Sequence, residues 1–113
     1  MVIDNNIQFD KNNKLKHFLN IENLTKRHIN DILNLADKFA SDKNKKFKNL
    51  EGKTVASLFF EPSTRTKTTF ELASKRLSAD FINIDIANSS TLKGESIIDM
   101  IKTLEAMQCD MFV

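Results

Sequence analysis

The sequence is poor in residues that build several common kinds of site. Its 113 residues include one cysteine, two glycines and one proline. A single cysteine excludes a disulfide framework and a cysteine-based zinc site. Cys109 lies in the run MQCDMFV, which is typical of the entry to a buried strand, so we expect it to pack in the core. Because glycine occurs only at Gly52 and Gly94, the spacings GxxxxGK[ST] and GxGxxG are absent, which excludes the usual glycine-rich nucleotide loops.

Long apolar runs and a strong charge of one sign are also missing. No stretch approaches the roughly 18 apolar residues of a membrane span, and the start, MVIDNNIQFD, does not resemble a signal peptide. We therefore expect an unprocessed cytoplasmic protein without membrane association. Seventeen Lys and Arg against fifteen Asp and Glu leave a net charge of +2, which does not favour nucleic-acid binding. The lysines between positions 43 and 48 are interpreted as a solvated helix end or linker.

The composition is otherwise that of a globular chain. Hydrophobic residues make up 41% of the sequence, and nine phenylalanines supply large apolar side chains for a core. At this length we expect one compact domain. Residues 1–14 are polar and follow no regular periodicity, so we expect a loosely attached leader without folded elements. The domain is then expected over residues 15–113.

Apolar periodicity changes several times along the rest of the chain. Apolar residues three and four positions apart are typical of amphipathic helices, and short apolar or alternating runs are typical of strands. Their order predicts an α/β fold, an open parallel sheet with flanking helices and right-handed crossovers, as in part of a three-layer αβα domain. The expected elements are a helix over 25–41 with Thr25 as N-cap, a strand over 54–60, a helix over 63–77, a strand over 81–86, a polar loop over 87–93, a helix beginning near Gly94 or Glu95, and a strand over 111–113.

The spacing also defines an apolar face on each expected helix. These faces consist of Ile29, Leu33, Ala36 and Ala40 in the first helix, Phe70, Ala73 and Leu77 in the second, and Ile97, Ile101, Leu104 and Met107 in the third.

A segment rich in hydrogen-bond donors follows the first expected strand. Residues 61–66, Glu-Pro-Ser-Thr-Arg-Thr, bring three hydroxyls and one guanidinium to a strand-to-helix turn. Ligands of open α/β sheets collect at such turns, because helix N-termini present unpaired N–H groups and a partial positive charge. We expect these donors to bind a phosphate group, for which arginine offers a bidentate fork. The alternative is that the hydroxyls only cap the helix and the arginine is solvated. The candidates are Ser63, Thr64, Arg65 and Thr66.

A second polar loop follows the second expected strand. Residues 88–96 again concentrate hydroxyls around one cation, Lys93, between a strand and a helix. From the local pattern alone, an exposed flexible turn is the stronger interpretation of this loop.

Several motifs together resemble one enzyme family. Residues 59–66 fit F-x-[EK]-x-S-[GT]-R-T, the signature of the carbamoyltransferases, at every position. Residues 89–95 resemble the SxxxKGE loop of that family, and residues 99–110 resemble the helix and strand entry that follow it. The resemblance covers about residues 15–113 and implies the front part of a carbamoyl-phosphate-binding domain. Lys67 and Thr69 depart from the family, which more often has Arg and Ser there.

The flanking residues favour one branch of the family. Glu61 and Pro62 before the serine have the aspartate-type form, whereas ornithine enzymes more often have Glu-Lys. Lys93 agrees, because an anionic second substrate needs a cation that the ornithine enzymes lack. An aspartate carbamoyltransferase is therefore expected. An ornithine carbamoyltransferase and a non-catalytic phosphate-binding or subunit-interaction module are the alternatives.

The resemblance also implies roles for individual residues. The family transfers the carbamoyl group of carbamoyl phosphate to the amine of L-aspartate in pyrimidine synthesis. The resemblance implies that Ser63, Thr64 and Thr66 bind phosphate and that Thr66 also reaches the carbonyl oxygen. It implies that Arg65 stabilises the leaving phosphate. Ser89 and Lys93 are expected to reach into a neighbouring subunit's site, where Lys93 would contact phosphate and aspartate. A homotrimer is thus implied, with regulatory chains in some members, and we expect no cofactor and no metal ion.

The resemblance further implies that the site is incomplete within these residues. In the family an Arg-His pair follows the third strand, and further phosphate contacts and the aspartate domain come later. Since the sequence ends at Val113, we expect an N-terminal fragment without measurable transferase activity on its own.

Overall fold

The structure is a computed structural model that describes residues 5–86 and 96–113. The chain divides into two compact units, unit 1 over Met1–Asn44 and unit 2 over Lys45–Val113. The predicted domain over residues 15–113 stays a prediction, because this division into compact units does not decide where a domain begins or ends. The division falls in the lysine-rich segment that was interpreted as a solvated linker, where charged side chains provide little apolar surface to bury.

Unit 1 contains two helices and an irregular segment between them. Helix α1 spans Asn5–Gln8, and an isolated antiparallel bridge joins Phe9 to Leu15. The expectation that residues 1–14 hold no folded element is thus wrong for this part of the leader. Periodicity could not reveal it, because α1 is a single turn held by hydrogen bonds of the Gln8 side chain rather than by an apolar face.

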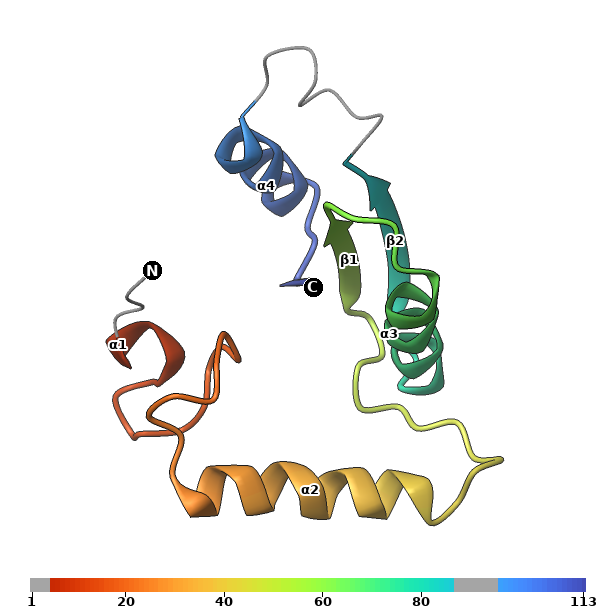
Figure 1. Ribbon diagram of the computed structural model, residues 1–113. Helices are drawn as coiled ribbons and strands as arrows, with labels where there is room; N and C mark the ends of the chain where they lie inside the picture. Colours follow the sequence, from red (N-terminus) through yellow and green to blue (C-terminus); the bar gives the residue numbers. More distant parts are fainter. Residues whose placement is uncertain (1–4, 87–95) are drawn as a thin grey trace. The chain divides into compact units, whose positions relative to one another are not determined.

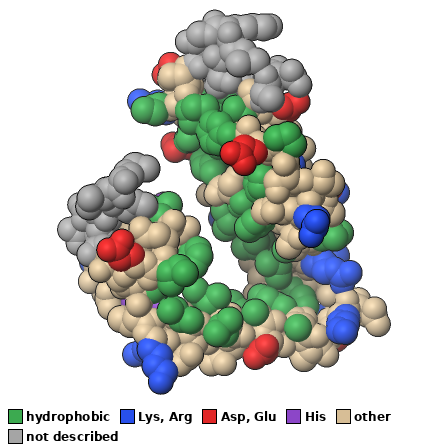
Figure 2. All heavy atoms as spheres, in the orientation of Figure 1, with side chains coloured by type: hydrophobic (Ala, Val, Ile, Leu, Met, Phe, Trp, Pro, Cys, Tyr) green, Lys and Arg blue, Asp and Glu red, His purple; other side chains and the backbone are tan. Residues whose placement is uncertain are grey.

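Helix α2 spans Lys26–Ala40, as predicted. Thr25 is its N-cap, and a capping box forms with His28: each side chain accepts a hydrogen bond from the other residue's backbone N–H. No residue of α2 is buried. The helix is therefore amphipathic as expected, but its apolar side chains lie at the surface of unit 1 (Figure 2).

Unit 2 is built on a three-stranded parallel sheet. Strands β1 (Thr54–Phe59), β2 (Asp80–Asp85) and β3 (Met111–Phe112) have the spatial order β2-β1-β3. Helix α3 (Thr64–Arg76) connects β1 to β2, and helix α4 (Ile97–Ala106) precedes β3. The predicted α/β class, the parallel sheet and the order of its elements are confirmed.

The two helices of unit 2 cover opposite faces of the sheet (Figure 1). The face toward α4 holds the apolar core, in which the partly buried Leu58 and Ile84 pack against buried residues. The buried members are Ala56, Ile86, Met100, Leu104 and Cys109. The predicted core position of Cys109 is confirmed, since it is 8% exposed.

The helix faces differ in detail from those that the spacing predicted. In α3 the buried residue is Ser74, not Ala73, and Phe70 remains 42% exposed. The Ser74 hydroxyl can be buried because it donates a hydrogen bond to the Phe70 carbonyl at 2.7 Å. In α4, Met100 and Leu104 are buried, whereas Met107 is the C-cap residue and is 70% exposed.

Candidate functional site

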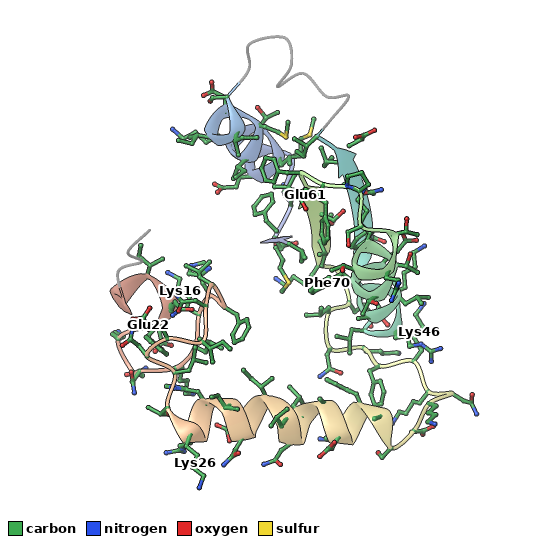
Figure 3. All side chains as sticks on the ribbon, viewed as in Figure 1. Lys16, Glu22, Lys26, Lys46, Glu61 and Phe70 are labelled. Carbon is green, nitrogen blue, oxygen red and sulfur yellow. The ribbon has the colours of Figure 1, made fainter. Side chains whose placement is uncertain are left out.

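The donor-rich segment lies at the turn from β1 to α3. Strand β1 ends at Phe59, and helix α3 begins at Thr64 with Ser63 as its N-cap. Glu61 lies in the turn between them (Figure 3). The first backbone bond of the helix runs from the Lys67 N–H to the Ser63 carbonyl at 3.0 Å. The preceding N–H groups in the first turn therefore have no partner within the helix.

Within residues 5–86 and 96–113, the side chains of residues 63–66 do not take part in the bonds that hold the fold together. Ser63 makes no side-chain cap hydrogen bond, which contradicts the interpretation that its hydroxyl only caps the helix. Thr64, Arg65 and Thr66 are exposed. Among the described residues, none of these four side chains forms a hydrogen bond or an ion pair. Three hydroxyls and a guanidinium thus remain available at one helix N-terminus.

The charge distribution along α3 favours an anion at this end. The first turn contains no acidic residue, and the last turn contains Lys75 and Arg76. The partial positive charge of the helix N-terminus is therefore not neutralised within the helix. Glu61, one of the residues that line the adjoining pocket, brings a negative charge to the same region.

An open pocket of about 510 Å³ adjoins this turn. Its apolar part comes from the end of β1 and from Val113, which follows β3, and its polar part comes from Ser63 and Glu61. The complete lining is Leu58, Phe59, Phe60, Glu61, Ser63 and Val113. The pocket therefore lies outside the carboxyl ends of two neighbouring parallel strands.

The strand order explains why a pocket forms here. From β1 the chain crosses to β2 on one side, and from β2 it returns past β1 to β3 on the other. Ligands of open α/β sheets bind at such switch points, where the connections diverge. Sequence reasoning missed Val113 as a wall of the pocket. The pattern of elements gives their order along the chain but not which strand pairs with which.

The second predicted loop is only partly within the described structure. Ser89 and Lys93 lie outside the described residues, so the structure does not test their roles. The flanks of the loop are described: Asp85 ends β2 and pairs in register with Phe59 of β1. Strand β2 therefore ends beside the end of β1, on the side of the sheet where the pocket lies.

Other kinds of site find no support in the described residues. Within residues 5–86 and 96–113, no group of three or more His, Cys, Asp or Glu side chains could hold a metal ion. In the same part of the chain, every helix is too short or too polar to cross a membrane.

Comparison with known proteins gives a family match over most of the chain. The family model described as "Aspartate/ornithine carbamoyltransferase, carbamoyl-P binding domain" matches residues 16–113. The match contains both units apart from residues 1–15, and it includes the turn between β1 and α3.

Solved structures give the same assignment. The catalytic subunit of M. jannaschii aspartate transcarbamoylase is 38% identical, with a TM-score of 0.77, over 87% of this chain and 33% of that chain. Aspartate transcarbamoylase from Trypanosoma cruzi, in complex with carbamoyl aspartate and phosphate, is 30% identical, with a TM-score of 0.75, over 83% and 31%. The same enzyme with carbamoyl phosphate is 31% identical, with a TM-score of 0.72, over 80% and 30%. The chain thus spans about a third of the length of these proteins.

Proposed function

The chain belongs to the aspartate/ornithine carbamoyltransferase family, and on this basis we propose that it forms the carbamoyl-phosphate site of an aspartate carbamoyltransferase. The enzyme would convert carbamoyl phosphate and L-aspartate to N-carbamoyl-L-aspartate and phosphate, in the cytoplasm and as a step of pyrimidine synthesis. The observation that carries the proposal is the set of unused donors of residues 63–66 at a sheet switch point.

The local geometry supports phosphate as the ligand at this turn. A phosphate group needs several donors that converge on a small anion. The α3 turn offers the unbonded N–H groups of its first residues, the hydroxyls of Ser63, Thr64 and Thr66, and the Arg65 guanidinium. Because Ser63 also lines the pocket, a phosphate bound here leaves the carbamoyl group free to enter the 510 Å³ space beside the strand ends.

The proposed chemistry is direct transfer without a covalent enzyme intermediate. The amine of aspartate attacks the carbonyl carbon, a C–N bond forms, and the bond from that carbon to the phosphate oxygen breaks. Phosphate leaves with the electron pair of the broken bond, and it takes up the proton that the amine loses. The protein must hold two anions together, polarise the carbonyl and stabilise charge on the leaving group.

The residue roles follow from this requirement. We assign Ser63 and Thr64 to phosphate binding and Arg65 to stabilisation of the charge that develops on the leaving phosphate. Thr66 would contact both phosphate and the carbonyl oxygen. The wall formed by the end of β1 and by Val113 is largely apolar, so the polar contacts to the ligand would come from the α3 turn.

The second substrate would be bound by residues beyond this turn. Lys93, with Ser89, is proposed to reach into the site of a neighbouring subunit and to contact phosphate and aspartate. The active form would then be a homotrimer, with regulatory chains as further partners. Ornithine as the acceptor is the competing proposal, and Lys93 is the residue that separates the two.

The anion site is tested by calorimetric titration of the 113-residue chain with carbamoyl phosphate and with inorganic phosphate. Circular dichroism first establishes that each variant is folded. We expect saturable binding that is lost in Arg65→Ala and retained in Arg27→Ala, which removes an exposed arginine of unit 1. A folded wild-type chain that binds neither anion would contradict a phosphate site formed by residues 63–66.

The acceptor is tested by the phosphonacetyl derivatives of aspartate and ornithine. We expect tighter binding of the aspartate derivative, and we expect Lys93→Ala to remove the difference. Equal binding, or a preference for the ornithine derivative, would favour the competing proposal. For the isolated chain we predict no measurable carbamoyl transfer, because closure over two substrates needs more than this part of the enzyme. Formation of N-carbamoyl-L-aspartate by the purified chain would overturn that prediction.

A further inference from the structure

Residues 5–15 precede the family match, which begins at residue 16, yet they are bound closely into unit 1. We call them the N-terminal strap; it contains α1 and the bridge between Phe9 and Leu15. Within the strap, Gln8 is only 1% exposed. It is the one buried residue in the part of unit 1 that the structure describes. The most enclosed point of unit 1 is therefore a polar side chain.

The buried amide of Gln8 has a partner for every donor and acceptor. Its Oε1 accepts hydrogen bonds from the backbone N–H groups of Leu19 at 2.8 Å and Asn20 at 3.1 Å. Its Nε2 donates to Asn20 Oδ1 at 3.0 Å and to the Glu22 carbonyl at 3.5 Å. An amide offers two lone pairs and two N–H groups, so its hydrogen-bonding capacity is filled.

The backbone of Gln8 binds the same segment again. Its carbonyl accepts hydrogen bonds from the N–H groups of Lys16 at 2.6 Å and His17 at 3.1 Å. Together with the side-chain bonds, one residue thus holds the segment between Lys16 and Glu22, whose ends are labelled in Figure 3. Residues 16–24 contain no helix or strand of their own, so these bonds replace a regular backbone ladder.

The other end of the strap is joined to α2. The Asn13 carbonyl accepts a hydrogen bond from Nε2 of His28 at 3.0 Å. Nδ1 of the same ring accepts from the Thr25 N–H at 3.1 Å, which places the ring proton on Nε2. The ring of Phe9 lies over His28 with 5.0 Å between the centroids. The strap therefore also contacts the capping box at the start of α2.

Apolar contacts do not offer an equivalent anchor for this segment. Phe18, Leu19 and Ile21 are 61%, 51% and 68% exposed, so their side chains bury little surface within unit 1. The conformation of residues 16–24 therefore depends on polar bonds to the strap.

We propose that the N-terminal strap fixes the conformation of residues 16–24 and of the first turn of α2, and that Gln8 is the residue that holds the two segments together. Without the Gln8 side chain, the N–H groups of Leu19 and Asn20 lose their partners, and residues 16–24 open to solvent. The entry to the family domain is then ordered by residues that the family match does not include. The proposal concerns unit 1 alone and does not depend on carbamoyl-phosphate binding.

The test is amide hydrogen exchange on the 113-residue chain and on its Gln8→Ala variant. We expect the amides of Leu19 and Asn20 to exchange about tenfold faster or more in the variant, because a buried acceptor has been removed. The amides of β1 should exchange at unchanged rates, which shows that unit 2 remains folded. The matched control is Lys11→Ala, an exposed strap residue without a hydrogen bond or ion pair among the described residues; it should leave Leu19 and Asn20 unchanged.

Unchanged exchange of Leu19 and Asn20 in Gln8→Ala would overturn the proposal. If this variant does not fold, Asn20→Ala decides, because it removes only the partner of Gln8 Nε2. Faster exchange confined to residues 16–24 in Asn20→Ala would support the strap, and unchanged exchange there would reject it.

Discussion

Unit 1 and unit 2 are organised by opposite kinds of interaction. In unit 2 the residues with the least exposure are mostly apolar, and the larger cluster of them packs between one sheet face and α4. In unit 1 the buried position among the described residues is Gln8, and the helix α2 buries no side chain. Unit 2 is therefore held by apolar burial with a parallel backbone ladder, whereas unit 1 is held by hydrogen bonds between side chains and irregular backbone.

The difference shows that a family match need not imply a uniform basis of stability. The match over residues 16–113 includes most of both units. A substitution of the same chemical kind should therefore have very different effects in the two units.

The largest expected effect comes from shortening one leucine in each unit. Leu104 is 8% exposed in the core of unit 2, so Leu104→Ala should cost about 2–5 kcal/mol of unfolding free energy. Leu33 in α2 is 56% exposed, so Leu33→Ala should change the stability of unit 1 by no more than about 0.5 kcal/mol. Native-state amide exchange reports each unit separately. Equal losses of unfolding free energy in the two variants would show that Leu33 is packed as tightly as Leu104, which its exposure in unit 1 contradicts.

An intermediate effect is expected from removing a helix cap in each unit. The Thr25 hydroxyl accepts the His28 N–H at 3.2 Å, so Thr25→Ala should cost unit 1 about 1 kcal/mol. The Ser63 hydroxyl makes no such bond, so Ser63→Ala should leave the stability of unit 2 nearly unchanged. The same variant should weaken phosphate binding. Urea unfolding followed by circular dichroism measures the first effect, and calorimetry measures the second. A marked loss of stability in Ser63→Ala would indicate that the hydroxyl is a structural cap.

The smallest expected effect comes from the ion pair of α3. Lys75 Nζ lies 2.9 Å from Glu71 Oε2, with the two side chains 59% and 43% exposed. Water screens such a pair, so Lys75→Ala should cost about 0.5 kcal/mol or less. Thermal unfolding at low and high salt measures it. A large and salt-dependent loss would contradict a unit 2 stabilised mainly by its apolar core.

The sequence predicted the elements of unit 2 closely because their periodicities are strong. The strand Thr54–Phe59 and the helix Thr64–Arg76 lie within one or two residues of their expected bounds. The N-cap Thr25 was also predicted correctly. The strand order β2-β1-β3 could not be predicted, because pairing between strands depends on contacts far apart in the sequence.

The hydrogen-bond donors of the candidate site could be predicted from the sequence, but the pocket beside them could not. The motif identified residues 63–66, and the structure places them together at one helix N-terminus. The pocket wall contributed by Val113 depends on the pairing of β3 with β1, which no local pattern encodes.

The burial of Gln8 was missed for a related reason. A buried polar residue in a polar, aperiodic segment carries no hydrophobic signal, and the partners of its side chain lie 11 to 14 positions away.

The buried Ser74 links the position of residues 63–66 to the packing of the opposite end of α3. Ser74 is 6% exposed, and α3 contacts both β1 and β2, so a small residue sits where the helix meets the sheet. Ser63 is eleven positions earlier, about 16 Å along the helix axis at 1.5 Å per residue. A larger side chain at position 74 would push the C-terminal end of α3 away from the sheet and so tilt the axis of the helix. The anion-binding end would then swing relative to the strand ends, although none of its own residues had changed.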